Sequence, residues 1–91
     1  MKNFSELIAD VKILHEEIQN KTYEIEEHIS LGQEEMEYIA RKYISEEELE
    51  TEEILFNEDT LSFFQKEREE LRQKLDKTMA DLSESLSKFE K

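Results

Sequence analysis

Proline is absent from this 91-residue chain, and glycine occurs once, at position 32. Folds that contain strands need tight turns between them, and those turns depend on glycine and proline. In addition, 36% of the residues are apolar and 41% are charged, which is a poor composition for a conventional core in a chain this short. The composition therefore indicates one all-α domain of elongated shape.

The apolar residues of the first half recur every three or four positions, as on one face of a helix. An extra four-residue step near Ile18 interrupts the heptad repeat as a stutter. Asn3 and Glu6 form a capping-box pattern at the start of the series, so we predict a helix over about 4–43, roughly 60 Å long. The series is Phe4, Leu7, Val11, Leu14, Ile18, Thr22, Ile25, Ile29, Gly32, Met36, Ile39 and Tyr43.

A second series of the same kind occupies the C-terminal third, with a stutter at Leu75. Laid antiparallel, the two series match as mirror images, so that Ile18 faces Leu75 and Gly32 faces Leu61. We therefore predict an elongated antiparallel coiled-coil helical hairpin within one chain, and a homodimer stays open. The second series is Leu61, Phe64, Arg68, Leu71, Leu75, Met79, Leu82, Leu86 and Phe89.

Between the two series, Ser45 and Glu48 form a second capping-box pattern. It predicts a short middle helix over about 46–56, followed by a turn at residues 57–60 and a last helix over about 58–89. One continuous helix through residue 56 is the alternative. The whole chain, residues 1–91, is expected to be a single helical domain with the middle helix at its tip.

The charge is concentrated at that tip. Residues 1–22 carry 3 basic and 4 acidic groups, residues 23–60 carry 2 and 14, and residues 61–91 carry 7 of each, for a net charge of −13. Such a charge repels nucleic acid and anionic membranes and attracts basic partners. The acidic tip is either a solvated surface that keeps the chain soluble or a surface that steers a basic partner.

Several apolar residues fall outside the two series. The middle helix could cover them with Leu49, Ile54 and Phe56, or a partner helix could bury them. Together with the acidic tip they form our candidate partner-binding site: Leu31, Tyr38, Ile44, Phe63, Glu46, Glu47, Glu48, Glu50, Glu52 and Glu53.

Two residues within the series need an explanation of their own. We expect the guanidinium of Arg68 to reach Glu24, Glu26 or another carboxylate of the tip, and to fix the register of the hairpin. We expect Gly32 to mark a kink or a close approach, because glycine costs about 1 kcal/mol relative to alanine inside a helix.

The sequence offers no pattern for catalysis. Cysteine is absent, and neither His15 nor His28 has the Glu-x-x-His spacing of di-iron bundles. There is no glycine-rich phosphate loop or nucleophile elbow. We therefore predict no enzyme activity, no catalytic residue, no metal and no cofactor.

The order of elements resembles the small helical partner proteins encoded with LXG-domain toxins of type VII secretion, which are akin to WxG-type helical hairpins. The last helix contains the sequence Leu61-Ser-Phe-Phe-Gln-Lys-Glu-Arg, and Ser30-Leu31-Gly32 stands at the place of the Trp-x-Gly motif. Flagellar and type III secretion chaperones are similar in being short, acidic and helical. The resemblance implies a helical client and carries over no functional residue.

We therefore expect a non-enzymatic helical protein-binding module, such as a secretion chaperone or targeting factor, whose client has a basic region. The alternative is an acidic inhibitor, as a phage-type antagonist or nucleic-acid mimic, of a basic nucleic-acid-binding protein. Direct nucleic-acid binding and membrane insertion are not expected. We expect a cytoplasmic location before any export, with export alongside a client as an option that needs no cleaved signal peptide.

Overall fold

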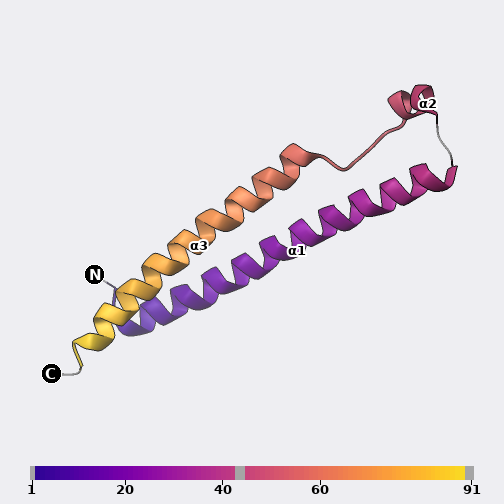
Figure 1. Ribbon diagram of the computed structural model, residues 1–91. Coiled ribbons are helices and arrows are strands. Elements are labelled where there is room, and N and C mark those ends of the chain that lie inside the picture. Colours follow the sequence, from indigo (N-terminus) through magenta and orange to yellow (C-terminus); the bar gives the residue numbers. More distant parts are fainter. Residues whose placement is uncertain (1, 43–44, 90–91) are drawn as a thin grey trace.

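The computed structural model describes residues 2–42 and 45–89, and this part of the chain contains three helices and no strand. They are α1 (Phe4–Lys42), α2 (Glu46–Thr51) and α3 (Glu58–Ser87). The two long helices run antiparallel and pack on each other in a particle of 71 × 17 × 15 Å, with α2 at the end opposite the termini (Figure 1). The predicted all-α helical hairpin is confirmed.

Side-chain caps start each helix where the sequence predicted. The amide of Glu6 donates to Asn3 Oδ1 at 2.9 Å, and the amide of Glu48 donates to Ser45 Oγ at 3.3 Å. Asn57 Oδ1 accepts from the amides of Asp59 and Thr60 at 2.8 and 3.2 Å. Because the backbone of Ser45 is extended (φ −72°, ψ 163°), the alternative of one continuous helix through residue 56 is wrong.

The middle helix is shorter than predicted. It ends at Thr51, five residues before the expected end near residue 56, and Glu52 already has an extended backbone (φ −74°, ψ 133°). The helix ends there because the amides of residues 55–57 bond to side chains of α1 instead of continuing a helical ladder. The expected end of the first helix at Tyr43 lies outside the described residues, and the last helix ends at Ser87, two residues before the predicted end.

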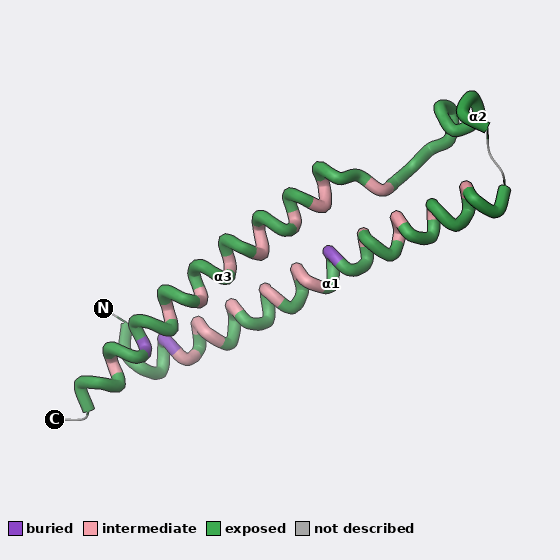
Figure 2. The backbone as a smooth tube through the Cα atoms, viewed as in Figure 1, coloured by how far each residue is buried: buried purple, intermediate pink, exposed green. Residues whose placement is uncertain are grey.

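The contact between the long helices follows a strict heptad repeat in both of them (Figure 2). The two predicted stutters are therefore wrong. In α3 the repeat leaves Met79 and Leu86 half exposed, although both were predicted to face α1. The buried and half-buried residues that follow the repeat are Leu7, Val11, Leu14, Ile18, Lys21, Ile25, His28, Gly32, Glu35 and Ile39 in α1, and Leu61, Phe64, Arg68, Leu71, Leu75, Thr78, Leu82 and Ser85 in α3.

The repeat brings polar side chains into the middle of the contact. Lys21, His28 and Glu35 occupy one heptad position in successive repeats, whereas the apolar Ile29 and Met36 lie at the exposed margin. The predicted series took Thr22, Ile29 and Met36 in place of the charged or more polar Lys21, His28 and Glu35, and so left the true repeat after Ile18. Among the described residues only Leu7, Ile25 and Leu82 are buried, and none of their side chains is completely enclosed, so the core is thin.

Candidate functional site

The segment after α2 is bound along α1 by backbone hydrogen bonds. We call residues 54–57 the strap. The carboxylate of Glu35 accepts from the amide of Leu55 at 2.6 Å and from the amide of Phe56 at 2.8 Å, one bond to each oxygen. The next amide, that of Asn57, donates to Nε2 of His28 at 3.0 Å. Hydrogen bonds to an ionised acceptor are stronger than neutral ones, so Glu35 is the principal anchor of the strap.

Phe56 is the side chain with which the strap packs against α1. Its ring stacks on that of His28, with centroids 5.0 Å apart and an interplanar angle of 26°. The ring also covers Gly32, where an added Cβ would come within 2.8 Å of Cδ2 of Phe56. The close approach predicted at Gly32 is confirmed. The side chain that makes it is Phe56 rather than Leu61.

Four of the predicted partner-binding residues line one shallow groove of about 250 Å³, which we call the lateral groove. Leu31 and Tyr38 lie on α1, and Glu52 and Glu53 lie just after α2. The groove thus combines apolar and acidic side chains from two parts of the chain. It is lined by Leu31, Glu34, Glu35, Tyr38, Ile39, Glu52, Glu53 and Ile54.

The other predicted residues are not brought into this groove. Phe63 is exposed on α3, with its ring 6.4 Å from that of Phe64, and Ile44 lies outside the described residues. The remaining acidic residues, Glu46, Glu47, Glu48 and Glu50, are exposed on α2. Within residues 2–42 and 45–89, α2 packs against neither long helix. The idea that a middle helix covers the apolar margin is therefore wrong, since Ile54 and Phe56 approach α1 as part of the strap.

A larger groove, which sequence reasoning missed, lies beside the lateral groove. We call this cavity of about 390 Å³ the apolar groove. Glu35, Ile39 and Ile54 line both grooves. A strict heptad repeat would have placed Ile29 and Met36 outside the helix contact and so indicated an apolar surface there. Both residues had been assigned to the contact from the sequence alone. The apolar groove is lined by Ile29, Gly32, Gln33, Glu35, Met36, Ile39, Ile54, Phe56 and Leu61.

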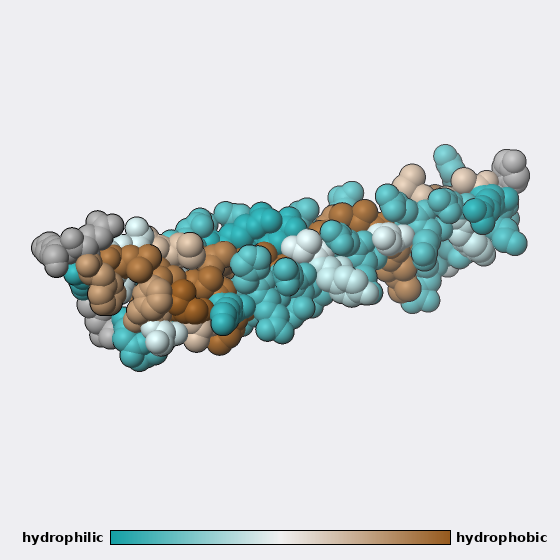
Figure 3. Space-filling model, turned by 90° about the horizontal axis from the view of Figure 1, so that it is seen from below, coloured by the Kyte–Doolittle hydropathy of each residue, from teal (hydrophilic) through white to brown (hydrophobic). Residues whose placement is uncertain are grey.

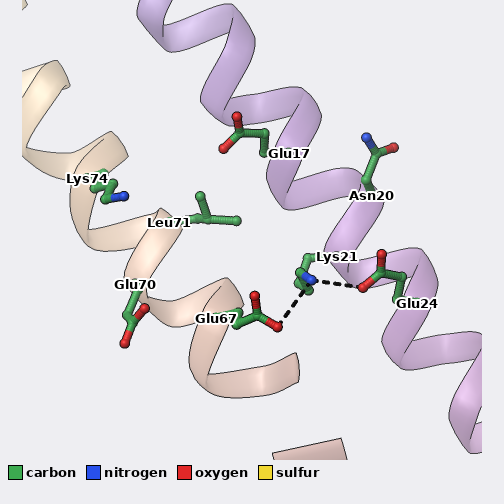
Figure 4. A pocket seen from close by; sticks show the side chains of 8 residues that line it. All are labelled: Glu17, Asn20, Lys21, Glu24, Glu67, Glu70, Leu71 and Lys74. Atoms are coloured by element: carbon green, nitrogen blue, oxygen red, sulfur yellow. Dashed lines mark hydrogen bonds and ion pairs between the residues drawn. The ribbon is translucent and has the colours of Figure 1, made fainter. Parts of the chain in front are cut away.

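The surface pattern changes along the hairpin. Figure 3 shows a broad apolar area near the termini and smaller apolar areas toward the tip, separated by hydrophilic surface. The hydrophilic middle includes a polar cleft of about 390 Å³ between α1 and α3 (Figure 4). It is lined by Glu17, Asn20, Lys21, Glu24, Glu67, Glu70, Leu71 and Lys74.

Lys21 bridges the two helices at this cleft. Its Nζ lies 2.9 Å from Oε2 of Glu24 and 3.3 Å from Oε1 of Glu67 (Figure 4), and 5.2 Å from the ring centroid of Phe64. The hydrogen bond to Glu24 raises the pKa of Lys21 above its usual 10.5, against an opposing effect of desolvation, and Glu67 raises it further. Lys21 therefore stays charged while its side chain is only 18% exposed.

The neighbouring Arg68 does not bind the carboxylates predicted for it. Its Nη1 donates to Oγ1 of Thr22 at 3.3 Å. Glu24 is bound by Lys21, three residues earlier on the same helix. The strict heptad repeat turns Lys21 toward α3, where it also pairs with Glu67 and links the two helices.

The ion pairs of Lys21 predict a loss of stability at alkaline pH. Since the pKa of Lys21 is raised on folding, its contribution is complete below the unfolded value of about 10.5 and disappears as the pH rises through the folded value. We expect Lys21→Met to lower the melting temperature at pH about 7 to 9, and the difference from the original chain to shrink as the pH rises above the unfolded value of about 10.5. Helical circular dichroism during heating measures this.

Lys12→Met is the matched control, because Lys12 is exposed on the same helix. The pKa of Tyr23 is also raised, by a hydrogen bond to Glu27. Because Tyr23 is present in the original chain and in both variants, its contribution to the melting temperature cancels when the variants are compared with the original chain. A difference between Lys21→Met and the original chain that stays unchanged as the pH rises above about 10.5 would contradict the assigned role of the ion pairs.

The described part of the chain contains neither a cluster of metal-binding side chains nor a membrane-spanning helix. No group of three or more His, Asp or Glu side chains in it could hold a metal ion. No helix within that part is long and apolar enough to cross a membrane. Comparison of the chain with protein families, with curated proteins and with solved structures found no match.

Proposed function

We propose that this chain is a non-enzymatic protein-binding module that packs on a helical client, as a secretion chaperone or targeting factor does. The observation that carries the proposal is the lateral groove, where Leu31 and Tyr38 lie beside Glu52 and Glu53. Tyr38 is exposed and Leu31 is half-buried. Helix-in-groove recognition uses accessible apolar side chains of this kind, and flanking carboxylates select a partner with basic residues.

The thin core supports the same proposal. A pair of helices buries a small fraction of its surface, so binding of a client adds stability that the chain lacks alone. The exposed carboxylates of α2 add long-range attraction of a basic client, which acts mainly on the association rate and weakens with salt.

The concentration of negative charge at the tip also favours a second candidate, an acidic inhibitor of a basic nucleic-acid-binding protein. Such an inhibitor would bind mainly through charge. Salt therefore separates the two functions, because apolar helix packing survives at high ionic strength and charge-driven binding does not.

A capture experiment tests the proposal. The tagged chain is mixed with extract of its source cells at about 0.15 M and at about 1 M salt, alongside the variant Leu31→Asp/Tyr38→Asp. We expect one protein to be retained stoichiometrically at both salt concentrations and to be lost with the variant, because the two aspartates would bring charge into the apolar contact. The purified client then allows its association rate to be measured.

Ile13→Asp is the control, since Ile13 is exposed on α1 away from the tip, and it should retain the client. With the client, Glu47→Lys/Glu48→Lys/Glu50→Lys should slow association roughly tenfold at low salt and leave the helix content unchanged. A protein that is retained only at low salt, and equally by the apolar variant, would support the inhibitor instead. Retention that is indifferent to both sets of variants would contradict both functions.

A further inference from the structure

The apolar groove has two walls from different parts of the chain. One wall is α1 from Ile29 to Ile39, a stretch of about 15 Å along the helix axis. The other consists of Ile54 and Phe56 of the strap and Leu61 of α3. The groove therefore follows α1 for nearly three helical turns, and its two walls come closest where Phe56 covers Gly32.

The strict heptad repeat is the reason that this slot lacks a cover. It turns Ile29 and Met36 to the margin of the helix contact, and α2, which would be the nearest element to cover them, packs against neither long helix in the described residues. The side chain of Met36 is 73% exposed as a result. Exposed apolar residues that line a groove are typical of an interaction site, and methionine adapts its shape to a partner.

The surrounding charge selects the partner. The segment 23–60, which supplies nearly all of the lining, carries 14 acidic and 2 basic residues. The carboxylate of Glu35 is bound to the strap, whereas Glu34, Glu52 and Glu53 line the adjoining lateral groove. A second copy of this chain would bring the same negative segment to the groove, and nucleic acid and anionic lipid would also be repelled.

We infer that the apolar groove holds the apolar face of a lysine- or arginine-rich amphipathic helix of a partner protein. Apolar side chains of that helix at positions i, i+3 or i+4, and i+7 enter the slot, and its basic residues meet the carboxylates at the rim. The inference rests on the proposed function and adds the place and the chemistry of the bound helix.

Three synthetic 18-residue peptides test the inference in solution. The first has leucines at i, i+3, i+4 and i+7 spacing with lysines on its other face, the second replaces every lysine by glutamate, and the third has the composition of the first without an apolar stripe. Titration is followed by calorimetry and by amide NMR. We expect the first peptide alone to bind with a defined stoichiometry at about 0.5 M salt and to shift the amides of Gly32 and Phe56.

A variant of the groove and a matched control complete the test. Met36→Gln/Ile54→Gln should raise the dissociation constant of the first peptide at least tenfold, while Met79→Gln should leave it unchanged, since Met79 is half exposed outside the tip. All the substituted residues are exposed, so circular dichroism should show intact helices.

Three results would overturn the inference. They are equal binding of the unstriped peptide, equal binding by the groove variant, and self-association of the chain that Met36→Gln abolishes, which would assign the groove to a second copy. Each can occur while the capture experiment retains a client through Leu31 and Tyr38, so the proposed function can survive this failure. Conversely, peptide binding in the groove without any captured client would support the groove as a binding site and contradict the chaperone function.

Discussion

Replacing Ile25 by aspartate is expected to unfold the hairpin. Ile25 is 4% exposed and is one of three buried residues among those that the structure describes. The substitution removes buried apolar area and places a carboxylate without a partner between the helices. We expect the free energy of unfolding to fall by about 3–5 kcal/mol, which approaches the whole stability of a marginally stable small domain of about 5 kcal/mol. Urea denaturation followed by circular dichroism measures the change.

Ile13→Asp provides the comparison, because it makes the same chemical change on the same helix at a residue that is 54% exposed. It should alter the free energy of unfolding by less than about 0.5 kcal/mol. If both variants lost the same stability, the effect would belong to helix propensity or net charge, and the role assigned to the contact at Ile25 would be wrong.

Replacing Glu35 by alanine is expected to release the strap from α1. The substitution removes the acceptors of the Leu55 and Phe56 amides. Hydrogen bonds to charged groups contribute about 1.5–3 kcal/mol each when shielded, and because Leu55 is exposed we expect about 1.5 kcal/mol for the pair. Hydrogen exchange at these two amides should become roughly tenfold faster, while exchange in the terminal halves of α1 and α3 stays unchanged.

Glu34→Ala is the matched control, since Glu34 is adjacent and makes neither of these bonds. It removes the same charge from the tip and should leave strap exchange as it was. Glu35→Gln keeps one oxygen acceptor and should give an intermediate rate. Unaltered exchange in Glu35→Ala would mean that Phe56 holds the strap through its ring contacts alone.

The sequence predicted the large features of the fold because they depend on patterns that stay the same when a few positions of the repeat are assigned wrongly. Mirror-image apolar series required an antiparallel hairpin whether or not a stutter was present. Polar caps at Asn3, Ser45 and Asn57 located the helix starts, because each side chain satisfies amides that lie at most three residues away. The concentration of acidic residues at the tip follows directly from the number of charged residues in each part of the sequence.

The details of the helix contact could not be predicted from the choice of apolar residues. Lys21, His28 and Glu35 take contact positions because each finds a specific partner, and the partners of His28 and Glu35 are three backbone amides of the strap. Hydrogen bonds to the strap cannot be predicted from the residue types before the position of the strap is known. The same omission hid the apolar groove, since Ile29 and Met36 were taken as part of the helix contact.

The seven-residue spacing of these polar side chains also limits how the chain can misfold. A slip of α1 by one heptad would preserve most apolar pairings, and coiled coils are prone to that error. In one direction the slip would place Lys21 against the amide of Asn57, and in the other it would place Lys42 against the amides that Glu35 binds. An ammonium group cannot accept a hydrogen bond, so both misaligned hairpins carry a penalty and a single alignment is selected.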